Sequence, residues 1–467
     1  MTSIASRINQ LDGADLEALR AGVSGTVVTP DHPDYDTARQ ILSLAFDRRP
    51  AAIVRCEGTR DVAFSVRFAR DRGIPFAPRS GGHSGMGFSS VDDAIVIDLG
   101  GMKQVTIDPV ERVAVVQAGT TSDDLAGPAS QYGLALSTGD TGSVGIGGLT
   151  VGGGIGWMVR KYGLTIDNLL AATVVTATGE VVRASEYEHP DLFWAIRGGG
   201  SNFGIVTDFT FRLAPSGMVH GGAIVLPATR EVLRGYIDYA PRAVDDLTTM
   251  AFLMAAPPAP FIPESVVGQP VLLVGAVWTG ALDDIEGRDA ALAPLRALAT
   301  PIADTVEAIP YPVMFAYTAE GTQRHGAALR MLFADDLTDA QLDASIDAIT
   351  HSTSPMSMIQ FRGMGGAVSR VPSDATAFPH RDVPLFVAAI GIWVDPEDDG
   401  EAHRAWVKDL WTHLAPASRG AYVNFLQDDG EQRLPEAYLD RMERLRQVKA
   451  KYDPENVFHF NANIRPE

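Results

Sequence analysis

The stretch Pro78-Arg79-Ser80-Gly81-Gly82-His83-Ser84-Gly85-Met86-Gly87 lies between two apolar segments, Ile74–Ala77 and Ala94–Leu99, whose composition predicts strands. Glycine has no Cβ, so the backbone N–H groups of such a loop can converge on an anion such as a pyrophosphate. His83 lies in the middle of the loop, beside whatever the loop binds. Short glycine patterns also recur by chance in surface turns, so this loop needs support from the rest of the chain.

A second glycine-rich stretch, Gly139–Trp157, has nine glycines in nineteen residues. Each glycine inside a helix or strand costs roughly 0.5–1 kcal/mol, so close approach of the backbone to a large ligand explains the density better than packing does. The interleaved apolar residues, which include Ile146, Leu149 and Trp157, are not typical of a flexible linker. The stretch matches neither a dinucleotide-binding fingerprint nor a P-loop. A third glycine-rich loop follows at Arg197–Gly204.

Length and composition narrow the class of protein. A chain of 467 residues is too long for one core and predicts two domains, one of which can be split in sequence. The net charge of -20 argues against nucleic acid or an anionic membrane as a partner. Cys56 is the single cysteine, so no intramolecular disulfide is possible, and we interpret it as a small buried hydrophobe. Met1–Arg20 has no apolar core of a signal peptide, and no segment could span a bilayer, so we expect a cytoplasmic protein.

The order of predicted elements indicates an α+β fold. In the first part we expect helices at Ala14–Ala21, Asp36–Phe46 and Asp61–Arg72, and a strand at Gly133–Leu136. After Pro215 the glycine density falls, and strands alternate with longer helices as in an antiparallel sheet covered by helices on one face. The strands expected there are Ala223–Leu226, Thr248–Met254, Val271–Trp278, Ser357–Phe361 and Leu385–Trp393, and the helices are Glu231–Tyr239, Ile285–Ala297, Asp339–Thr350 and Glu401–Leu414.

The C-terminal segment combines an amphipathic helix with a polar tail. Apolar residues at helical spacing predict one helix over Leu434–Lys451. In the tail, Asn461 and Asn463 lie on the same face of an extended segment. Two amides that face one way suit a heterocycle with alternating donors and acceptors, and they suit the capping of neighbouring turns equally well.

Together these segments resemble the flavoprotein superfamily of vanillyl-alcohol oxidase, and more narrowly its berberine-bridge-enzyme-like branch. The resemblance covers the chain from about residue 47 to the C-terminus and lies in long motifs in a fixed order. These are Arg79–Ser84, Gly145–Gly156, Lys161–Asn168, Asp191–Gly204, Tyr452–Phe458 and Asn461–Ile464. It implies a two-domain α+β fold of the PCMH-type FAD-binding class. Residues 1–215 would form the FAD-binding domain, residues 216–415 an antiparallel-sheet substrate domain, and residues 416–467 a segment that returns to the FAD domain.

The resemblance also implies the cofactor and its ligands. His83 corresponds to the histidine that bonds covalently to the flavin. Many relatives have a second link through a cysteine, but Thr141 occupies that position here, so we expect FAD held by one covalent bond. The other residues expected to contact FAD are Arg79, Ser80, Gly81, Gly82, Ser84, Gly139, Thr141, Gly142, Ser143, Gly145, Gly148, Gly154, Val206, Asn461 and Asn463.

The catalytic residues carry over less directly. Relatives take them from strands above the flavin, which correspond here to Ile359–Gly366 and Ala421–Phe425. Phe425 replaces the catalytic tyrosine of plant relatives. Gln360 and Arg362 replace acidic residues of a bacterial member, so neither base is present.

The remaining candidates are Gln360, Arg362, Tyr422 and Asn424. Gln360 and Arg362 alternate on one strand face. They could bind an anionic or carbonyl-bearing substrate, or they could be structural. Tyr422 could act as an acid–base group or only bind.

The function expected from the resemblance is oxidation of a small organic molecule by hydride transfer to the flavin, with molecular oxygen as acceptor and H2O2 as product. An alcohol, amine, phenol, sugar or natural-product intermediate would fit as substrate. The alternatives are a dehydrogenase of the same fold with another acceptor, and a flavin-binding protein without catalysis.

Overall fold

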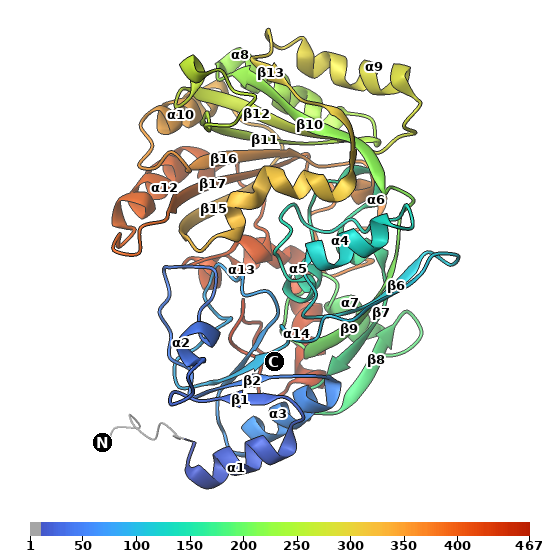
Figure 1. Cartoon of the computed structure of the whole chain (residues 1–467), viewed down its shortest axis with the longest axis vertical. Coiled ribbons are helices and arrows are strands. Elements are labelled where there is room, and N and C mark those ends of the chain that lie inside the picture. The colour runs from blue at the N-terminus through green and yellow to red at the C-terminus, as the bar shows by residue number, and fades with distance from the viewer. Residues whose placement is uncertain (1–10) are drawn as a thin grey trace.

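The structure is a computed structural model that describes residues 11–467, apart from the side chains of residues 319–322. Residues 1–10, the first half of the Met1–Arg20 stretch in which no signal peptide is expected, lie outside the described residues. The chain forms three β-sheets, of which two are built from the N-terminal 212 residues and the largest from the middle of the chain (Figure 1). The predicted fold class, two-domain α+β with an antiparallel sheet, is confirmed, while the domain limits at residues 215 and 415 stay predictions. Across residues 11–467 no helix combines the length and the apolar character that crossing a bilayer requires.

The first sheet positions the loop that contains His83. Its strands pair in the order β1-β2-β4-β3, with parallel pairs on both sides of β4. The loop begins where β3 ends, at Arg79. The elements are α1 (Gly13–Gly22), β1 (Thr26–Val28), α2 (Tyr35–Ala38), β2 (Ala52–Arg55), α3 (Thr59–Asp71), β3 (Phe76–Arg79) and β4 (Ile95–Asp98).

The second sheet is antiparallel, with the strand order β5-β6-β9-β7-β8. Most of the Gly139–Trp157 stretch lies outside helices and strands. Part of that stretch is itself the helix α5, which starts directly after Gly145. The elements are β5 (Val105–Asp108), β6 (Val113–Gln117), α4 (Ser122–Ser130), α5 (Ile146–Gly152), α6 (Val159–Tyr162), β7 (Leu169–Val175), β8 (Val181–Ser185), α7 (Pro190–Ala195) and β9 (Ile205–Arg212).

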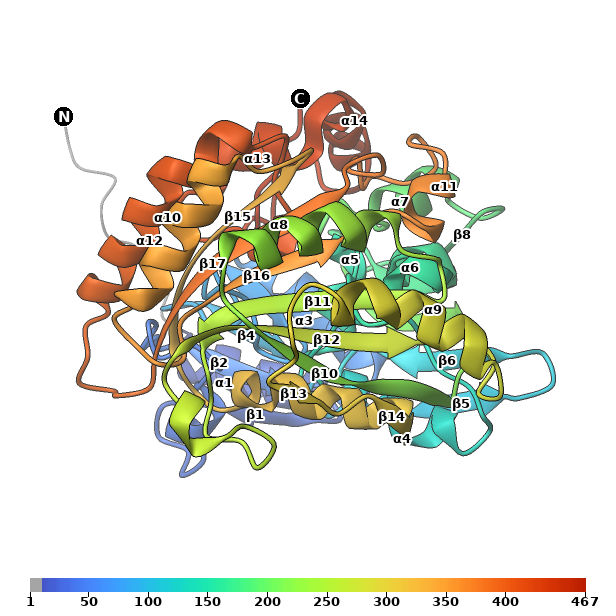
Figure 2. The same ribbon diagram turned by 90° about the horizontal axis from the view of Figure 1, so that it is seen from above.

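The third sheet is eight-stranded and antiparallel. Its strands follow the order β13-β10-β12-β11-β16-β17-β15, with β14 also paired to β10. Helices α8, α9, α10 and α12 lie over one face, as Figure 2 shows from above. The elements are β10 (Met218–Pro227), α8 (Arg230–Tyr239), β11 (Leu247–Ala255), β12 (Pro270–Trp278), α9 (Ile285–Arg296), β13 (Ala303–Asp304), β14 (Glu307–Pro310), β15 (Gly326–Ala334), α10 (Asp339–Thr350), β16 (Met358–Gly363), α11 (Ala367–Arg370), β17 (Leu385–Trp393) and α12 (Glu401–Leu414).

Both faces of this sheet are buried, and the period-two alternation of each strand divides its side chains between them. In β16, Ile359 and Phe361 pack into the core under the helices. Residues Gln360 and Arg362 therefore face the opposite side, toward the glycine-rich loops, and both are buried. The prediction that Gln360 and Arg362 share one strand face is confirmed by this register.

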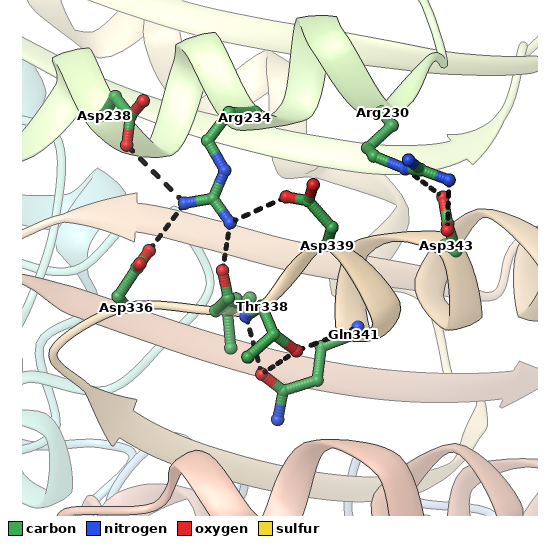
Figure 3. A network of polar contacts seen from close by, with 9 residues as sticks. Arg230, Arg234, Asp238, Asp336, Thr338, Asp339, Gln341 and Asp343 are labelled. Atoms are coloured by element: carbon green, nitrogen blue, oxygen red, sulfur yellow. Dashed lines mark hydrogen bonds and ion pairs between the residues drawn. The ribbon is translucent and has the colours of Figure 1, made fainter.

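Ion pairs join the outer helices α8 and α10 at the surface (Figure 3). Arg234 lies within 2.8 Å of Asp336 and 3.4 Å of Asp339, and it also donates to the backbone carbonyl of Leu337. Arg230 makes a two-pronged contact with Asp343. A single exposed ion pair contributes little to the free energy of unfolding. Most of the stabilisation at this contact therefore comes from Arg234, which has several partners.

We expect Arg234→Ala to lower the free energy of unfolding by about 1–2 kcal/mol, because it removes a donor from a part-buried carbonyl as well as several ion pairs. Arg230→Ala removes only one exposed pair, so we expect a much smaller loss of stability than for Arg234→Ala. Urea unfolding of both variants checks the difference, and equal losses would contradict the role given to Arg234.

Four details of the predicted secondary structure are wrong. The helix predicted over Asp36–Phe46 ends at Ala38, because Leu42 and Leu44 donate their N–H groups to Gly82 and His325 and not to their own turn. The strand predicted at Gly133–Leu136 is a single bridge from Ala135 to Ala214.

The predicted C-terminal helix is broken into α13 (Gly430–Tyr438) and α14 (Met442–Tyr452) at Leu439, whose φ is 47°. The strand expected at Ala421–Phe425 is a short 3-10 turn, η6 (Val423–Phe425).

Candidate active site

A cavity of about 920 Å³ lies between the inner face of the large sheet and the glycine-rich loops. One part of its wall is glycine-rich backbone, and another part is apolar side chains of β11, β12, β16 and β17. The C-terminal tail and the turn at η6 complete it. The cavity thus brings together segments that are far apart in sequence.

The two main glycine-rich loops contact one another backbone to backbone. A Cβ on Gly145 would lie 2.3 Å from the backbone nitrogen of Gly81, and a Cβ on Gly81 would lie 2.4 Å from the nitrogen of Gly145. Ser80 fixes the arrangement by donating its hydroxyl to the carbonyl of Ala118 at 2.6 Å. Glycine is required at this crossing because no side chain fits between the two backbones.

The loop holds His83 as a neutral imidazole at the cavity wall. Its Nε2 lies 3.0 Å from the hydroxyl of Ser143 in the second loop. Burial, and to a smaller extent the nearby His325, lowers the pKa of His83 to about 4. A neutral ring has an uncharged nitrogen available for bonding, which is the state that a nucleophilic imidazole needs.

The C-terminal tail contributes Asn461 to the cavity. Its amide nitrogen donates to the carbonyls of Ser201 and Phe458 at 2.9 and 3.1 Å. Its Oδ1 is buried and has no hydrogen-bond partner within residues 11–467. A ligand with an N–H group would satisfy this acceptor.

Arg362 and Asp140 form an ion pair at the sheet side of the cavity. Arg362 Nη2 lies 2.6 Å from Asp140 Oδ2 and 2.8 Å from Gln360 Oε1, and Nη1 donates to the carbonyl of Ile155. The two side chains are 5% and 17% exposed, so the pair lies mostly out of solvent. These contacts fix the guanidinium in one orientation.

Tyr422 lies next to Gly153 and Gly154, directly after the glycine-rich helix α5. Its hydroxyl oxygen accepts hydrogen bonds from the N–H of Gly154 at 2.9 Å and from the amide of Asn424 at 3.0 Å. Burial raises its pKa to about 12. The phenol therefore keeps its proton at neutral pH, and with both lone pairs occupied it is a donor rather than a base.

The structure brings most of the predicted site residues to this one cavity. Those that line it are Ser80, Gly81, Gly82, His83, Ser84, Gly139, Thr141, Gly145, Gly148, Val206, Gln360, Arg362, Tyr422, Asn424 and Asn461. Their contacts with a bound cofactor or substrate stay predictions.

Five predicted residues are not part of the cavity wall. Arg79 pairs with Asp98 at 2.7 Å. Ser143 contacts His83, and Gly154 contacts Tyr422. The other two, Gly142 and Asn463, also lie outside the cavity lining.

The lining residues that the sequence did not predict include one acid, Asp140, and one histidine, His325. Asp140 had a signal, because it is the one charged residue in Gly139–Trp157. His325 had none, because it lies directly before strand β15 (Gly326–Ala334), which the sequence did not predict.

Comparisons with known proteins agree with this geometry. A family profile described as "FAD binding domain" matches residues 50–185, and one described as "Berberine and berberine like" matches residues 421–465. An uncharacterised FAD-linked oxidoreductase of Bacillus subtilis is 32% identical over 455 residues, which cover 95% of this chain and 97% of that protein. The (R)-6-hydroxynicotine oxidase of Paenarthrobacter nicotinovorans is 32% identical over 476 residues, with coverage of 95% and 97%.

The same similarity holds in three dimensions. The crystal structure of 6-hydroxy-D-nicotine oxidase from Arthrobacter nicotinovorans superposes with a TM-score of 0.84 at 31% identity, covering 95% of this chain and 98% of that one. Berberine bridge enzyme in complex with (S)-reticuline superposes with a TM-score of 0.85 at 23% identity, which supports the fold alone. With two family profiles, two relatives above 30% identity and a shared fold, the chain belongs to the berberine-bridge-enzyme-like FAD-linked oxidoreductases.

Proposed function

We propose that this FAD-linked oxidoreductase is an oxidase of a small organic molecule, that molecular oxygen reoxidises its flavin with release of H2O2, and that the flavin is attached through His83 alone. The observation that carries the proposal is the position of the neutral His83 in the wall of the same cavity as Gln360, Arg362 and Tyr422. One cavity thus combines a histidine to which a flavin could be attached with polar side chains that could bind a substrate. The word "oxidase" in the name of a relative 32% identical over nearly the whole chain supports the choice of acceptor.

The residues present fit FAD. A Cβ on Gly148 would meet no atom within 4 Å, so the cavity is open above this backbone. The unpartnered Oδ1 of Asn461 offers an acceptor to a heterocycle. The loops at Ser80–Ser84 and Gly139–Gly148 would hold the pyrophosphate and the flavin through backbone groups.

FAD held by these loops would supply a hydride acceptor for a C–H bond of the substrate. The residues of this chain bind and orient the substrate beside it. Arg362 and Gln360 present polar groups from one strand face, and the protonated Tyr422 offers an O–H. The apolar side chains of the sheet exclude water from the same space.

A substrate panel tests the proposal. The purified protein is mixed without oxygen with 6-hydroxynicotine, glucose or 4-hydroxybenzyl alcohol, and bleaching of the flavin is followed. We expect at least one compound to bleach the flavin, and admission of air to restore the colour with formation of H2O2.

A reduced flavin that persists in air and is reoxidised only by a dye would contradict the choice of oxygen and favour the dehydrogenase. A flavin that dithionite reduces and no panel compound reduces would count against oxidation of these classes of molecule.

A further inference from the structure

We propose that Asp140 is a catalytic residue of this site, which takes the proton from a substrate hydroxyl, and that the substrate is a largely apolar molecule with an uncharged hydroxyl group. This inference rests on the proposed oxidation and narrows its substrate. It gives the site the base that the residues carried over from relatives do not supply.

Asp140 is the one carboxylate among the described residues that line the cavity. The loop that carries it is fixed, because the backbone carbonyl of Asp140 accepts hydrogen bonds from the indole of Trp157 at 3.1 Å and from the hydroxyl of Thr318 at 2.6 Å. Thr141, next in sequence, also lines the cavity. The carboxylate is thus held at the meeting point of the glycine-rich wall and the large sheet.

Arg362 balances the charge of this carboxylate. Its guanidinium lies 4.7 Å from the ring centre of Phe386 and 5.8 Å from that of Phe425, and its Nε is buried without a partner in the part of the chain that the structure describes. Because Arg362 offsets the charge of Asp140, the lining carries no net negative charge that would attract a cationic amine. A neutral substrate fits this balance better.

Two donors lie near the pair and would bind the oxygen of such a hydroxyl. Within residues 11–467, the amide nitrogen of Gln360 contacts only the sulfur of Met358, at 3.9 Å, and the Tyr422 O–H donates to no acceptor. An unpaired donor in a buried site favours a ligand that supplies an acceptor. The hydroxyl oxygen supplies one, and its proton has Asp140 as acceptor.

The rest of the sheet-side wall is apolar. Its side chains come from four strands and a loop, and they are Phe252, Met254, Phe261, Leu273, Met358, Ile390 and Ile392. A sugar would leave most of its hydroxyl groups without partners against this wall, which is unfavourable. An aromatic or aliphatic skeleton buries its surface there.

The reaction is balanced by these groups. The O–H bond of an alcohol breaks and its proton passes to the carboxylate of Asp140. The C–H bond on the carbon that bears the hydroxyl also breaks. Its hydrogen and two electrons pass to FAD, and the carbon becomes a carbonyl carbon. For a phenol with a benzylic C–H bond para to the hydroxyl, the phenolic proton passes to Asp140, and the quinone methide results when the benzylic hydrogen also leaves with two electrons to FAD. Since burial keeps Tyr422 protonated, the carboxylate is the acceptor that the site offers.

A binding experiment tests the hydroxyl contact without turnover. The probes are 4-chlorophenol and 4-chloroanisole, which differ by a methyl group on the oxygen and carry no benzylic C–H. We expect wild-type holoenzyme to bind the phenol at least about ten-fold more tightly, as a hydrogen bond to a charged group predicts. The double variant D140N/R362Q removes both charges together. In this variant we expect the affinity for 4-chlorophenol to exceed that for 4-chloroanisole by less than about threefold.

A wild type without preference, or a double variant that keeps the full preference, would overturn the inference. The matched control is R230Q/D343N, which removes the exposed pair of Figure 3 and should keep the wild-type preference.

The rate of flavin reduction gives the second readout, with the panel compound that reduces the wild type fastest. We expect D140N to lower this rate by about 100-fold or more, the usual effect of removing a general base. D140N leaves Arg362 unpaired and can lose stability for that reason, so the double variant is decisive. A rate that stays low in folded, flavin-loaded D140N/R362Q supports the base, and a rate restored to within about threefold of wild type overturns it. Because the binding comparison needs no turnover, it separates failure of this inference from failure of the proposed oxidation.

Discussion

Replacement of Lys449 by methionine is expected to lower the free energy of unfolding by about 3–5 kcal/mol, as is typical when one partner of a buried ion pair is removed. Lys449 and Asp453 are both 0% exposed, and Nζ lies 2.6 Å from Asp453 Oδ2. The ammonium also donates to the carbonyls of Asn202 and Phe458, at 2.9 Å each. Methionine fills a similar volume but leaves the carboxylate and two carbonyls without their donor.

The effect should reach the cofactor site. Asp453 accepts the N–H groups of Val457 and Phe458, and so holds the start of the tail that carries Asn461. We therefore expect a lower flavin content as well as a lower midpoint in urea unfolding. Lys451→Met is the control, because its pair with Asp191 is exposed and should contribute less than about 1 kcal/mol. Equal losses in the two variants would contradict the role of the buried pair.

Replacement of Gly145 by alanine is expected to lower the affinity for FAD by about 5- to 150-fold, which corresponds to about 1–3 kcal/mol of strain from an added methyl group. The new Cβ would lie 2.2 Å from Ser80 Oγ and 2.3 Å from Gly81 N. The serine hydroxyl can rotate, but the backbone nitrogen cannot move unless the two loops separate. Separation displaces His83 and the backbone groups proposed to hold the pyrophosphate.

The readout is the fraction of purified chains that carry flavin. Gly127→Ala serves as the control, because a Cβ at Gly127 in α4 meets no atom within 4 Å and alanine favours a helix. We expect this control to keep its full flavin content. A Gly145→Ala protein with wild-type flavin content would show that the crossing of the loops is not needed for binding.

The sequence predicts the fold class and most of the cavity wall because the relevant signals are local. Glycine density marks the segments where backbones come close, and alternation in Ser357–Phe361 predicts which side chains of β16 share a face. The break of the C-terminal helix at Leu439 has no such local signal in the sequence. Both halves of the predicted helix are amphipathic, and the turn depends on packing, with Tyr438 donating to the carbonyl of Gly199.

The pairing of Asp140 with Arg362 could not be predicted from the sequence either, because 222 residues separate the two and only the folded chain brings them together. The same holds for β15. Its pairing with β17, from Gly326–Trp393 to Ala334–Leu385, places His325 at the cavity beside His83. Residues of ordinary local pattern acquire a role at a site through such long-range contacts.

The most direct test of the account is the absorbance of the protein after acid precipitation, for wild type, His83→Ala and Thr141→Ala. We expect a yellow pellet for wild type and for Thr141→Ala, because one bond through His83 retains the flavin. We expect a colourless pellet for His83→Ala. A colourless wild-type pellet with free flavin in the supernatant would contradict the attachment at His83, and a yellow His83→Ala pellet would place the bond at another residue.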